Sequence, residues 1–264
     1  MWTRIFSRTN RPPAPPALPE GIRIYAVGDV HGRFDLVNDV LSQIDLDIAL
    51  NPVPRPLVVF LGDYIDRGPA SRAVLDRLAG SGFMREAVFL KGNHERLAIE
   101  FLKDPSVLET WRQFGGLETL VSYGIHPSIR PTYNECMELS RAFARALPET
   151  HRRFLDTLKL SFSCGDFFFV HAGVKPGVPL ARQREEDLLW IRDEFLNCDE
   201  DFGKFVVHGH EPVREPDMRI NRINIDTGAF ATGRLCCLVI EGTTLIPITD
   251  RNGWRKRIFR SRPA

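Results

Sequence analysis

The chain has 264 residues, 43% of them hydrophobic and 26% charged, so it can bury the core of one large domain or two small ones. Its formal net charge of +1 provides no global field that would favour nucleic acid or membranes, and no apolar run has the length of a membrane span. The five cysteines form no Cys-x-x-Cys pair, which argues against a zinc ribbon or a redox motif, and their odd number favours a reducing, cytoplasmic compartment.

The N-terminal stretch is rich in proline and contains several basic residues. It lacks the apolar segment of a signal peptide, and its prolines predict a flexible, extended lead over residues 1–20. We expect the main domain over residues 21–250.

Five short apolar segments are each followed at once by polar residues and glycine. "IRIYAV" precedes "GDVHG", "PLVVFL" precedes "GDYIDRG", "EAVFL" precedes "KGNHE", "DFFFV" precedes "HAG", and "KFVV" precedes "HGH". Segments of this length, rich in β-branched and aromatic residues and bounded by glycine, predict strands.

Helical patterns lie between the early strands, as in "RFDLVNDVLSQI", "SRAVLDRLAGSG" and "NHERLAIEFL". Alternating strands and helices predict βαβ units and a largely parallel sheet. Residues 103–160 read as helices and loops, whereas "RINIDTGAF", "RLCCLVIEG" and "TTLIPIT" predict antiparallel strands. The basic segment 251–264 is expected as a solvated tail, with weak contact to an anionic surface as the alternative.

Metal-ligand types accumulate after these strands. Functional groups of open α/β sheets gather at the carboxyl ends of the strands, and each polar motif stands at such an end. The pooled donors are Asp29, His31, Asp63, Asn93, His171 and His210. Imidazole, carboxylate and amide oxygen together suit Mn²⁺, Fe²⁺ or Zn²⁺. Six donors are too many for one catalytic ion with an open position, and they suit two ions about 4 Å apart that share a carboxylate.

Three further polar residues allow two interpretations each. His208 alternates away from His210 on a strand, which favours a core or supporting position over a ligand. Glu95 is interpreted as a helix-start residue rather than a general base. Asp226 in "IDTGA" either braces the site from behind or stabilises a turn.

The motifs "GDVHG", "GDYIDRG", "GNHE", "HAG" and "HGH", in this order, resemble those of the calcineurin-like metallophosphoesterases. More narrowly they resemble the phosphoprotein phosphatases, which include bacterial serine/threonine phosphatases, bacteriophage lambda phosphatase and symmetrical dinucleoside tetraphosphatases. The resemblance covers roughly residues 22–242, and "WRQFGGLETLVSYG" and "DLLWIRDEF" look like the bacterial type. It implies an α/β fold of two face-to-face β-sheets flanked by helices, with the helical segment 103–160 beside the active-site mouth.

The resemblance also implies a ligand set for two divalent ions. Asp29 and His31 would hold the first ion, Asp63 would bridge both, and the second would be completed by Asn93, His171 and His210. Mn²⁺ is the expected metal, with Fe²⁺, Fe³⁺ or Zn²⁺ as alternatives. A water that bridges the two ions would supply hydroxide as the nucleophile.

The remaining roles implied by the resemblance concern proton transfer and phosphate. His94 would be the catalytic imidazole and general acid, and Asp66 would orient it. Arg67 and Arg192 would bind the substrate phosphate. One residue departs from the pattern, because "HGHEP" has Glu211 where relatives usually have threonine.

The expected activity is metal-dependent phosphoester hydrolysis on a phosphoprotein, as in a serine/threonine phosphatase. The first alternative is a symmetrical dinucleoside polyphosphate hydrolase, whose substrate is a phosphorylated small molecule. The second belongs to another class, a metal-bound scaffold without turnover, and intact His94, Asp66 and Arg67 argue against it. We expect no specific nucleic-acid binding.

Overall fold

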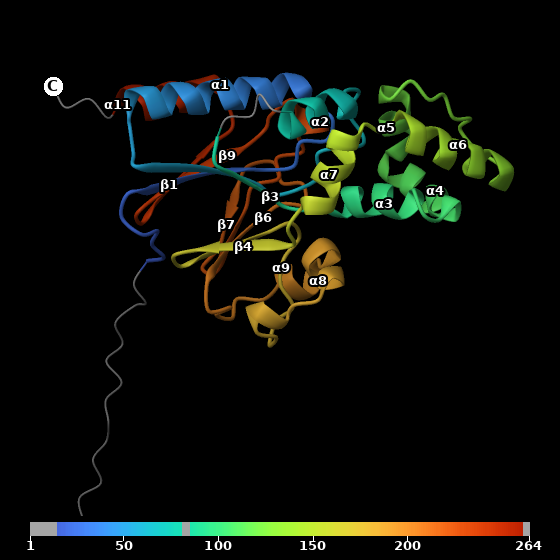
Figure 1. Ribbon diagram of the computed structural model, residues 1–264. Coiled ribbons are helices and arrows are strands. Elements are labelled where there is room, and N and C mark those ends of the chain that lie inside the picture. Colours follow the sequence, from blue (N-terminus) through green and yellow to red (C-terminus); the bar gives the residue numbers. More distant parts are fainter. Residues whose placement is uncertain (1–14, 81–84, 261–264) are drawn as a thin grey trace, which may run out of the picture.

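The computed structural model describes residues 15–80 and 85–260, with side chains described through residue 257. Two five-stranded sheets lie face to face (Figure 1). The first sheet has the order β10-β9-β1-β2-β3 and the second the order β4-β5-β6-β8-β7. This arrangement confirms the predicted α/β fold with two sheets flanked by helices.

The first sheet combines a parallel centre with an antiparallel edge. Its strands are β1 (Ile22–Val27), β2 (Arg55–Phe60), β3 (Ala87–Phe89), β9 (Cys237–Glu241) and β10 (Thr244–Ile248). Val27 is paired with Phe60, and Phe60 with Phe89. The three parallel strands therefore end at the same level, and the loops that follow them start side by side.

The second sheet has a parallel centre of β5, β6 and β8 with antiparallel strands at both edges. Its strands are β4 (Ser161–Cys164), β5 (Phe167–Val170), β6 (Phe205–His208), β7 (Asp217–Met218) and β8 (Arg222–Asn224).

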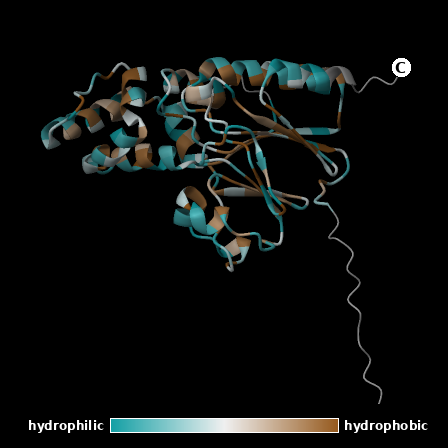
Figure 2. Cartoon of the chain, turned by 180° about the vertical axis from the view of Figure 1, so that it is seen from behind, coloured by the Kyte–Doolittle hydropathy of each residue, from teal (hydrophilic) through white to brown (hydrophobic). Residues whose placement is uncertain are grey.

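Side chains alternate across the strands, so each sheet contributes to two layers of the core. In β1, Ile24 and Ala26 face the second sheet and pack with residues such as Phe169 and Val207. Tyr25 and Val27 point the opposite way, into the cluster formed with the helices. Figure 2 shows the hydrophobic residues concentrated on the strands.

Helices cover the outer faces of the sandwich (Figure 1). They are α1 (Phe34–Leu50), α2 (Ser71–Ala79), α3 (Asn93–Phe101), α4 (Leu108–Trp111), α5 (Gly116–Ser122), α6 (Tyr133–Ala146), α7 (Glu149–Thr157), α8 (Glu185–Trp190), α9 (Asp193–Leu196), α10 (Ala229–Thr232) and α11 (Arg251–Arg260). Short 3₁₀ turns lie at Pro105–Val107, Arg112–Phe114 and Leu180–Arg182. Among the helices in the described part of the chain, none has both the length and the apolar composition needed to cross a bilayer.

The two terminal segments are more tightly attached than the sequence suggested. Residues 1–14 of the expected lead lie outside the described residues, but Leu18 is buried and its N–H donates to the Gly242 carbonyl at 2.9 Å. The expected solvated tail begins instead as helix α11, whose Trp254 is buried and stacks on Tyr25. The indole supplies an apolar contact for a helix that otherwise consists mainly of basic and polar residues.

Candidate active site

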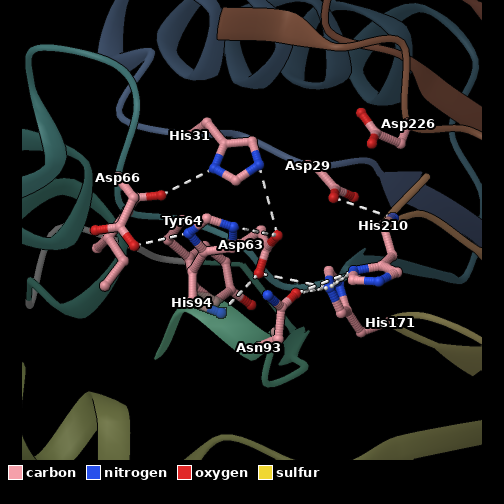
Figure 3. A network of polar contacts seen from close by, with 12 residues as sticks. Asp29, His31, Asp63, Tyr64, Asp66, Asn93, His94, His171, His210 and Asp226 are labelled. Carbon is pink, nitrogen blue, oxygen red and sulfur yellow. Dashed lines mark hydrogen bonds and ion pairs between the residues drawn. The ribbon is translucent and has the colours of Figure 1, made fainter. Parts of the chain in front are cut away.

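The six predicted metal ligands converge at the strand ends of both sheets (Figure 3). Asp29 and His31 follow β1, Asp63 follows β2, and Asn93 opens α3 after β3. The second sheet contributes His171 after β5 and His210 after β6. All six side chains are buried.

Asp63 lies at the centre of this cluster. Its Oδ2 is 3.5 Å from His31 Nε2 and 3.6 Å from His94 Nε2, while its Oδ1 is 3.5 Å from His171 Nε2. Two groups of ligand atoms result, His31–Asp63–His94 and Asp63–His171–His210, and both contain Asp63. One carboxylate shared by two groups is the arrangement that a bridging ligand requires.

In the second group, polar atoms face one another closely. Asn93 Oδ1 is 2.9 Å from His171 Nε2 and 3.0 Å from His210 Nδ1, and the two ring nitrogens are 3.2 Å apart. Burial lowers the pKa of His171 to about 3, and burial also lowers the pKa of His210. Neutral imidazoles with an available lone pair are the form that binds a metal.

Asp29 lies beside the loop of His210. Its Oδ2 accepts the His210 backbone N–H at 3.1 Å, and its buried Oδ1 has no hydrogen-bond partner among the described residues. A Cβ on Gly209 would collide with that same Oδ1, so only glycine leaves the space open. An orphaned, buried carboxylate oxygen in such a cradle fits a cation that completes its coordination.

The charges of the cluster fit divalent ions as well. Burial, together with the neighbouring charges of Asp226 and Asp63, raises the pKa of Asp29 well above its usual range. Burial and the charge of Glu95 raise the pKa of Asp63 likewise. Carboxylates packed this closely and this deeply are costly as anions unless cations accompany them.

Backbone strain is concentrated at this site. Among the described residues, the non-glycine positions with positive φ are His31, Asp63, Asp66, Arg67 and His210, at 45° to 72°. Each such conformation costs on the order of 1–3 kcal/mol and persists only where the surrounding structure enforces it. These backbone conformations therefore lower the stability of the fold, and they fix the directions of the side chains in the site.

His94 and Asp66 form a buried pair next to the cluster. The distance from His94 Nδ1 to Asp66 Oδ2 is 2.7 Å, and Trp111 Nε1 donates to the same oxygen at 2.6 Å. Thr119 Oγ1 donates to Asp66 Oδ1 at 2.5 Å. Burial raises the pKa of Asp66 to about 7, against the effect of the Thr119 and Trp111 hydrogen bonds. Burial lowers the pKa of His94, whose Nε2 faces Asp63.

Glu95 has a larger part in the site than the sequence indicated. Its buried carboxylate accepts the backbone N–H groups of Asp63 at 2.9 Å, Tyr64 at 2.8 Å and Gly92 at 2.9 Å. The bond to Gly92 agrees with the predicted helix-start position. The bonds to Asp63 and Tyr64 tie the loop after β2 to the loop after β3, and no local pattern predicts them. Trp111 and Thr119 were missed for the same reason.

His208 and Asp226 occupy supporting positions. His208 is buried at the end of β6, outside both ligand groups, with its ring against Phe195 at a centroid distance of 4.9 Å. The core interpretation of His208 is thereby confirmed. Asp226 accepts the Gly228 N–H at 2.8 Å and also stands beside Asp29 (Figure 3), so it stabilises a turn and borders the site.

The two arginines expected to bind phosphate have different partners. The Arg67 guanidinium lies over the Phe230 ring at 4.9 Å from its centroid, and no described carboxylate pairs with it. Arg192 forms an ion pair with Glu211, and both side chains are partly exposed. Arg67 thus shares the Phe230 ring with His31 and has no carboxylate partner among the described residues, whereas Arg192 is paired with Glu211.

Aromatic rings border the cluster on three sides. Phe114 contacts His94 edge-to-face at 5.8 Å, Trp190 contacts His210 at 6.1 Å, and Phe230 contacts His31 at 5.5 Å. None of the three rings is fully buried. Phe114 comes from the helical segment 103–160 and brings that segment into contact with His94.

Comparisons with known proteins agree with this arrangement. A family model described as calcineurin-like phosphoesterase matches residues 22–237. The Bis(5'-nucleosyl)-tetraphosphatase PrpE (asymmetrical) of Bacillus subtilis is 29% identical over 230 residues, which cover 79% of this chain and 87% of the relative. A crystal structure named provisionally as a diadenosine tetraphosphatase has a TM-score of 0.57 and 21% identity, covering 87% of this chain and 94% of that one. The cold-active protein-tyrosine phosphatase of a Shewanella species has a TM-score of 0.55 and 15% identity, with 88% and 81% covered.

Proposed function

The chain belongs to the calcineurin-like phosphoesterase family, and is thus a phosphoester hydrolase of the metallophosphoesterase kind; from this premise we propose that its substrate is a dinucleoside tetraphosphate. The observation that carries the proposal is the 29% identity with an asymmetrical bis(5'-nucleosyl)-tetraphosphatase over most of both chains. We therefore favour a dinucleoside polyphosphate over a phosphoprotein as the substrate. We also expect asymmetrical cleavage in place of the symmetrical cleavage that the sequence motifs suggested.

The donor set supports two ions in this proposal. Asp63, which belongs to both ligand groups, would bridge the ions. His31 and the unpartnered Asp29 carboxylate would complete the first ion, and Asn93, His171 and His210 would complete the second. When bound, the ions supply an acidified water as nucleophile and positive charge for the phosphate oxygens. Mixed imidazole, carboxylate and amide ligands favour Mn²⁺, with iron or Zn²⁺ as alternatives.

Protein side chains supply the remaining chemistry. His94 Nδ1 lies 2.7 Å from Asp66 Oδ2, which leaves His94 Nε2 facing the cluster. With the ring protonated and held by the Asp66 carboxylate, Nε2 would donate a proton to the departing oxygen. Arg67 can hold two phosphate oxygens at once because its guanidinium has no competing carboxylate among the described residues. These poised groups argue against a scaffold without turnover.

Product analysis tests the substrate. Protein loaded with Mn²⁺ is incubated with diadenosine tetraphosphate, and the nucleotides are separated by anion exchange. Asymmetrical cleavage of a four-phosphate chain yields ATP and AMP in equal amounts, whereas symmetrical cleavage yields ADP alone. If ADP is the sole product, the enzyme cleaves symmetrically. If no nucleotide product forms, a dinucleoside tetraphosphate is not the substrate.

The second candidate is a serine/threonine protein phosphatase, which the His94–Asp66 pair favours. A serine alkoxide is a poor leaving group and needs a proton, whereas a nucleotide phosphate leaves more readily without one. Phosphoserine and phosphotyrosine peptides, assayed beside diadenosine tetraphosphate, separate the candidates. The preferred substrate is the one with the highest kcat/KM.

A further inference from the structure

The ion pair between Arg192 and Glu211 stands beside the proposed phosphate site. Arg192 Nη1 donates to Glu211 Oε2, and the two side chains are 48% and 36% exposed. The pair lies on the His210 side of the cluster. Glu211 directly follows His210 in the chain, and Trp190, two residues before Arg192, contacts the His210 ring at a centroid distance of 6.1 Å. Both members of the pair are therefore next to residues of the cluster.

Both members of the pair are attached to anchored backbone. Glu211 directly follows His210; its N–H donates to the Gly209 carbonyl at 2.9 Å, and its own carbonyl accepts from Asn224 Nδ2 at 2.7 Å. The Arg192 carbonyl accepts the backbone N–H groups of Phe195 and Leu196 in α9, each at 2.9 Å. The pair can separate by side-chain rotation alone, without movement of either backbone.

A carboxylate and a phosphate present similar acceptor geometry to a guanidinium, because both offer two oxygens to its planar fork. Exposed ion pairs are screened by solvent and are individually weak. A phosphate dianion close to Arg192 can therefore exchange with the Glu211 carboxylate at small cost.

We propose that Glu211 is a specificity-determining residue that occupies Arg192 in place of the substrate phosphate and so weakens the site's affinity for phosphate groups. The inference rests on the proposed function in one respect, the assignment of Arg192 to phosphate. In the free protein Arg67 is the available phosphate-binding guanidinium, and Arg192 joins it only when the incoming phosphate displaces Glu211.

Glu211→Gln tests the proposal, since glutamine keeps the size of the side chain and removes its charge. Inorganic phosphate is titrated into the full, Mn²⁺-loaded chain by calorimetry, which requires no turnover. We expect phosphate to bind about 1.5- to 5-fold more tightly, the range that the strength of exposed ion pairs allows. The matched control is Glu215→Gln, which breaks the similarly exposed pair with Arg234 and should leave phosphate affinity unchanged.

The same titration in an Arg192→Ala background completes the test. If Glu211 acts through Arg192, Glu211→Gln adds no affinity when Arg192 is absent. Unchanged or weaker phosphate binding by the single variant would overturn the proposal, as would tightening that persists without Arg192. Because the measurement reads phosphate binding and not hydrolysis, a failure here is distinguishable from a failure to cleave diadenosine tetraphosphate.

Discussion

At the scale of single residues, His94 presents its two ring nitrogens to different partners, Nδ1 to Asp66 and Nε2 to the metal-ligand cluster. If Nε2 protonates the departing oxygen, the value of His94 depends on how much that oxygen needs a proton. We expect His94→Asn to lower kcat on a phosphoserine peptide by about 10²–10⁴-fold, the usual worth of general acid catalysis. On p-nitrophenyl phosphate the loss should be distinctly smaller, because nitrophenolate leaves unaided.

Steady-state kinetics on both substrates check this expectation, with the metal content of each preparation measured because Asn93 is adjacent. Equal losses on the two substrates in metal-replete protein would show that His94 is not the leaving-group acid.

Arg67 provides a second residue-level prediction. A lysine keeps the charge but cannot hold two phosphate oxygens, and it stacks less well on the Phe230 ring. Arg67→Lys should therefore lower kcat/KM about tenfold or more while the metal content stays normal. Phe230→Leu is the companion variant and should give a smaller loss through KM. Unchanged kinetics in Arg67→Lys would remove Arg67 from the phosphate site.

The burial of His208 should make the stability of the protein depend on pH. Burial lowers the pKa of His208 to about 4, against about 6.5 in an unfolded chain. As the pH falls, the unfolded state takes up the proton first. The contribution of the buried, neutral His208 ring to the free energy of unfolding is therefore complete above pH 6.5 and is lost as the pH falls towards 4. The loss amounts to about 3 kcal/mol.

His208→Asn cannot take up that proton. The free energy of unfolding of the wild type, minus that of the variant, should therefore fall by about 3 kcal/mol between pH 7 and pH 4. Urea denaturation of both proteins with a chelator present measures this difference, and titrations common to both cancel. A difference independent of pH would contradict the burial of a neutral ring at this position.

At the scale of elements, the segment from α4 to α5 holds Asp66 in place with Trp111 and Thr119. Trp111→Phe keeps most of the ring and removes the N–H donor. We expect a kcat about 10-fold or more lower on a phosphoserine peptide, since a group that orients a reactive residue is typically worth 10–100-fold. Thr119→Val should act in the same direction. An unchanged kcat in both variants would show that these donors serve packing alone.

Helix α11 is attached to the body through one large apolar side chain. Trp254 is 3% exposed and stacks on Tyr25 at a centroid distance of 6.5 Å. We expect Trp254→Ala to lower the free energy of unfolding by about 3–5 kcal/mol, as measured by chemical denaturation. Arg255→Ala on the exposed face is the control and should change stability by less than about 0.5 kcal/mol. Equal effects of the two variants would show that Trp254 does not attach α11 to the rest of the domain.

At the scale of the whole molecule, the proposed ligands join the two sheets. Asp29, His31, Asp63 and Asn93 belong to loops of the first sheet, and His171 and His210 to loops of the second. A ligand that binds only the folded state adds about 2.7 kcal/mol at 100 times its dissociation constant. Mn²⁺ at that level should raise the Tm of the chelator-treated protein by about 5–10 °C.

Asp63→Asn should abolish that Tm shift because Asp63 belongs to both ligand groups, and Asp29→Asn should only reduce it. Thermal unfolding with and without Mn²⁺, together with metal analysis, provides the comparison. Equal, mild effects of the two variants would exclude Asp63 as a bridge.

The sequence by itself determined where strands end and which chemical groups follow them. Apolar segments such as Ile22–Val27 are set by local alternation and glycine boundaries, and parallel strands bring the loops after them to one edge. For that reason Asp29, His31, Asp63, Asn93, His171 and His210 were predictable as one cluster before any contact was known.

Only the tertiary structure decided which side chains meet across long stretches of chain. It placed Trp111 and Thr119 on Asp66, Glu95 between two loops, Asp29 beside the His210 backbone, and Glu211 on Arg192. It also buried Trp254 of α11 against Tyr25, although the composition of this helix predicts a solvated tail. These contacts depend on how separately formed elements pack, and local periodicity carries no information about packing between elements that are distant in the chain.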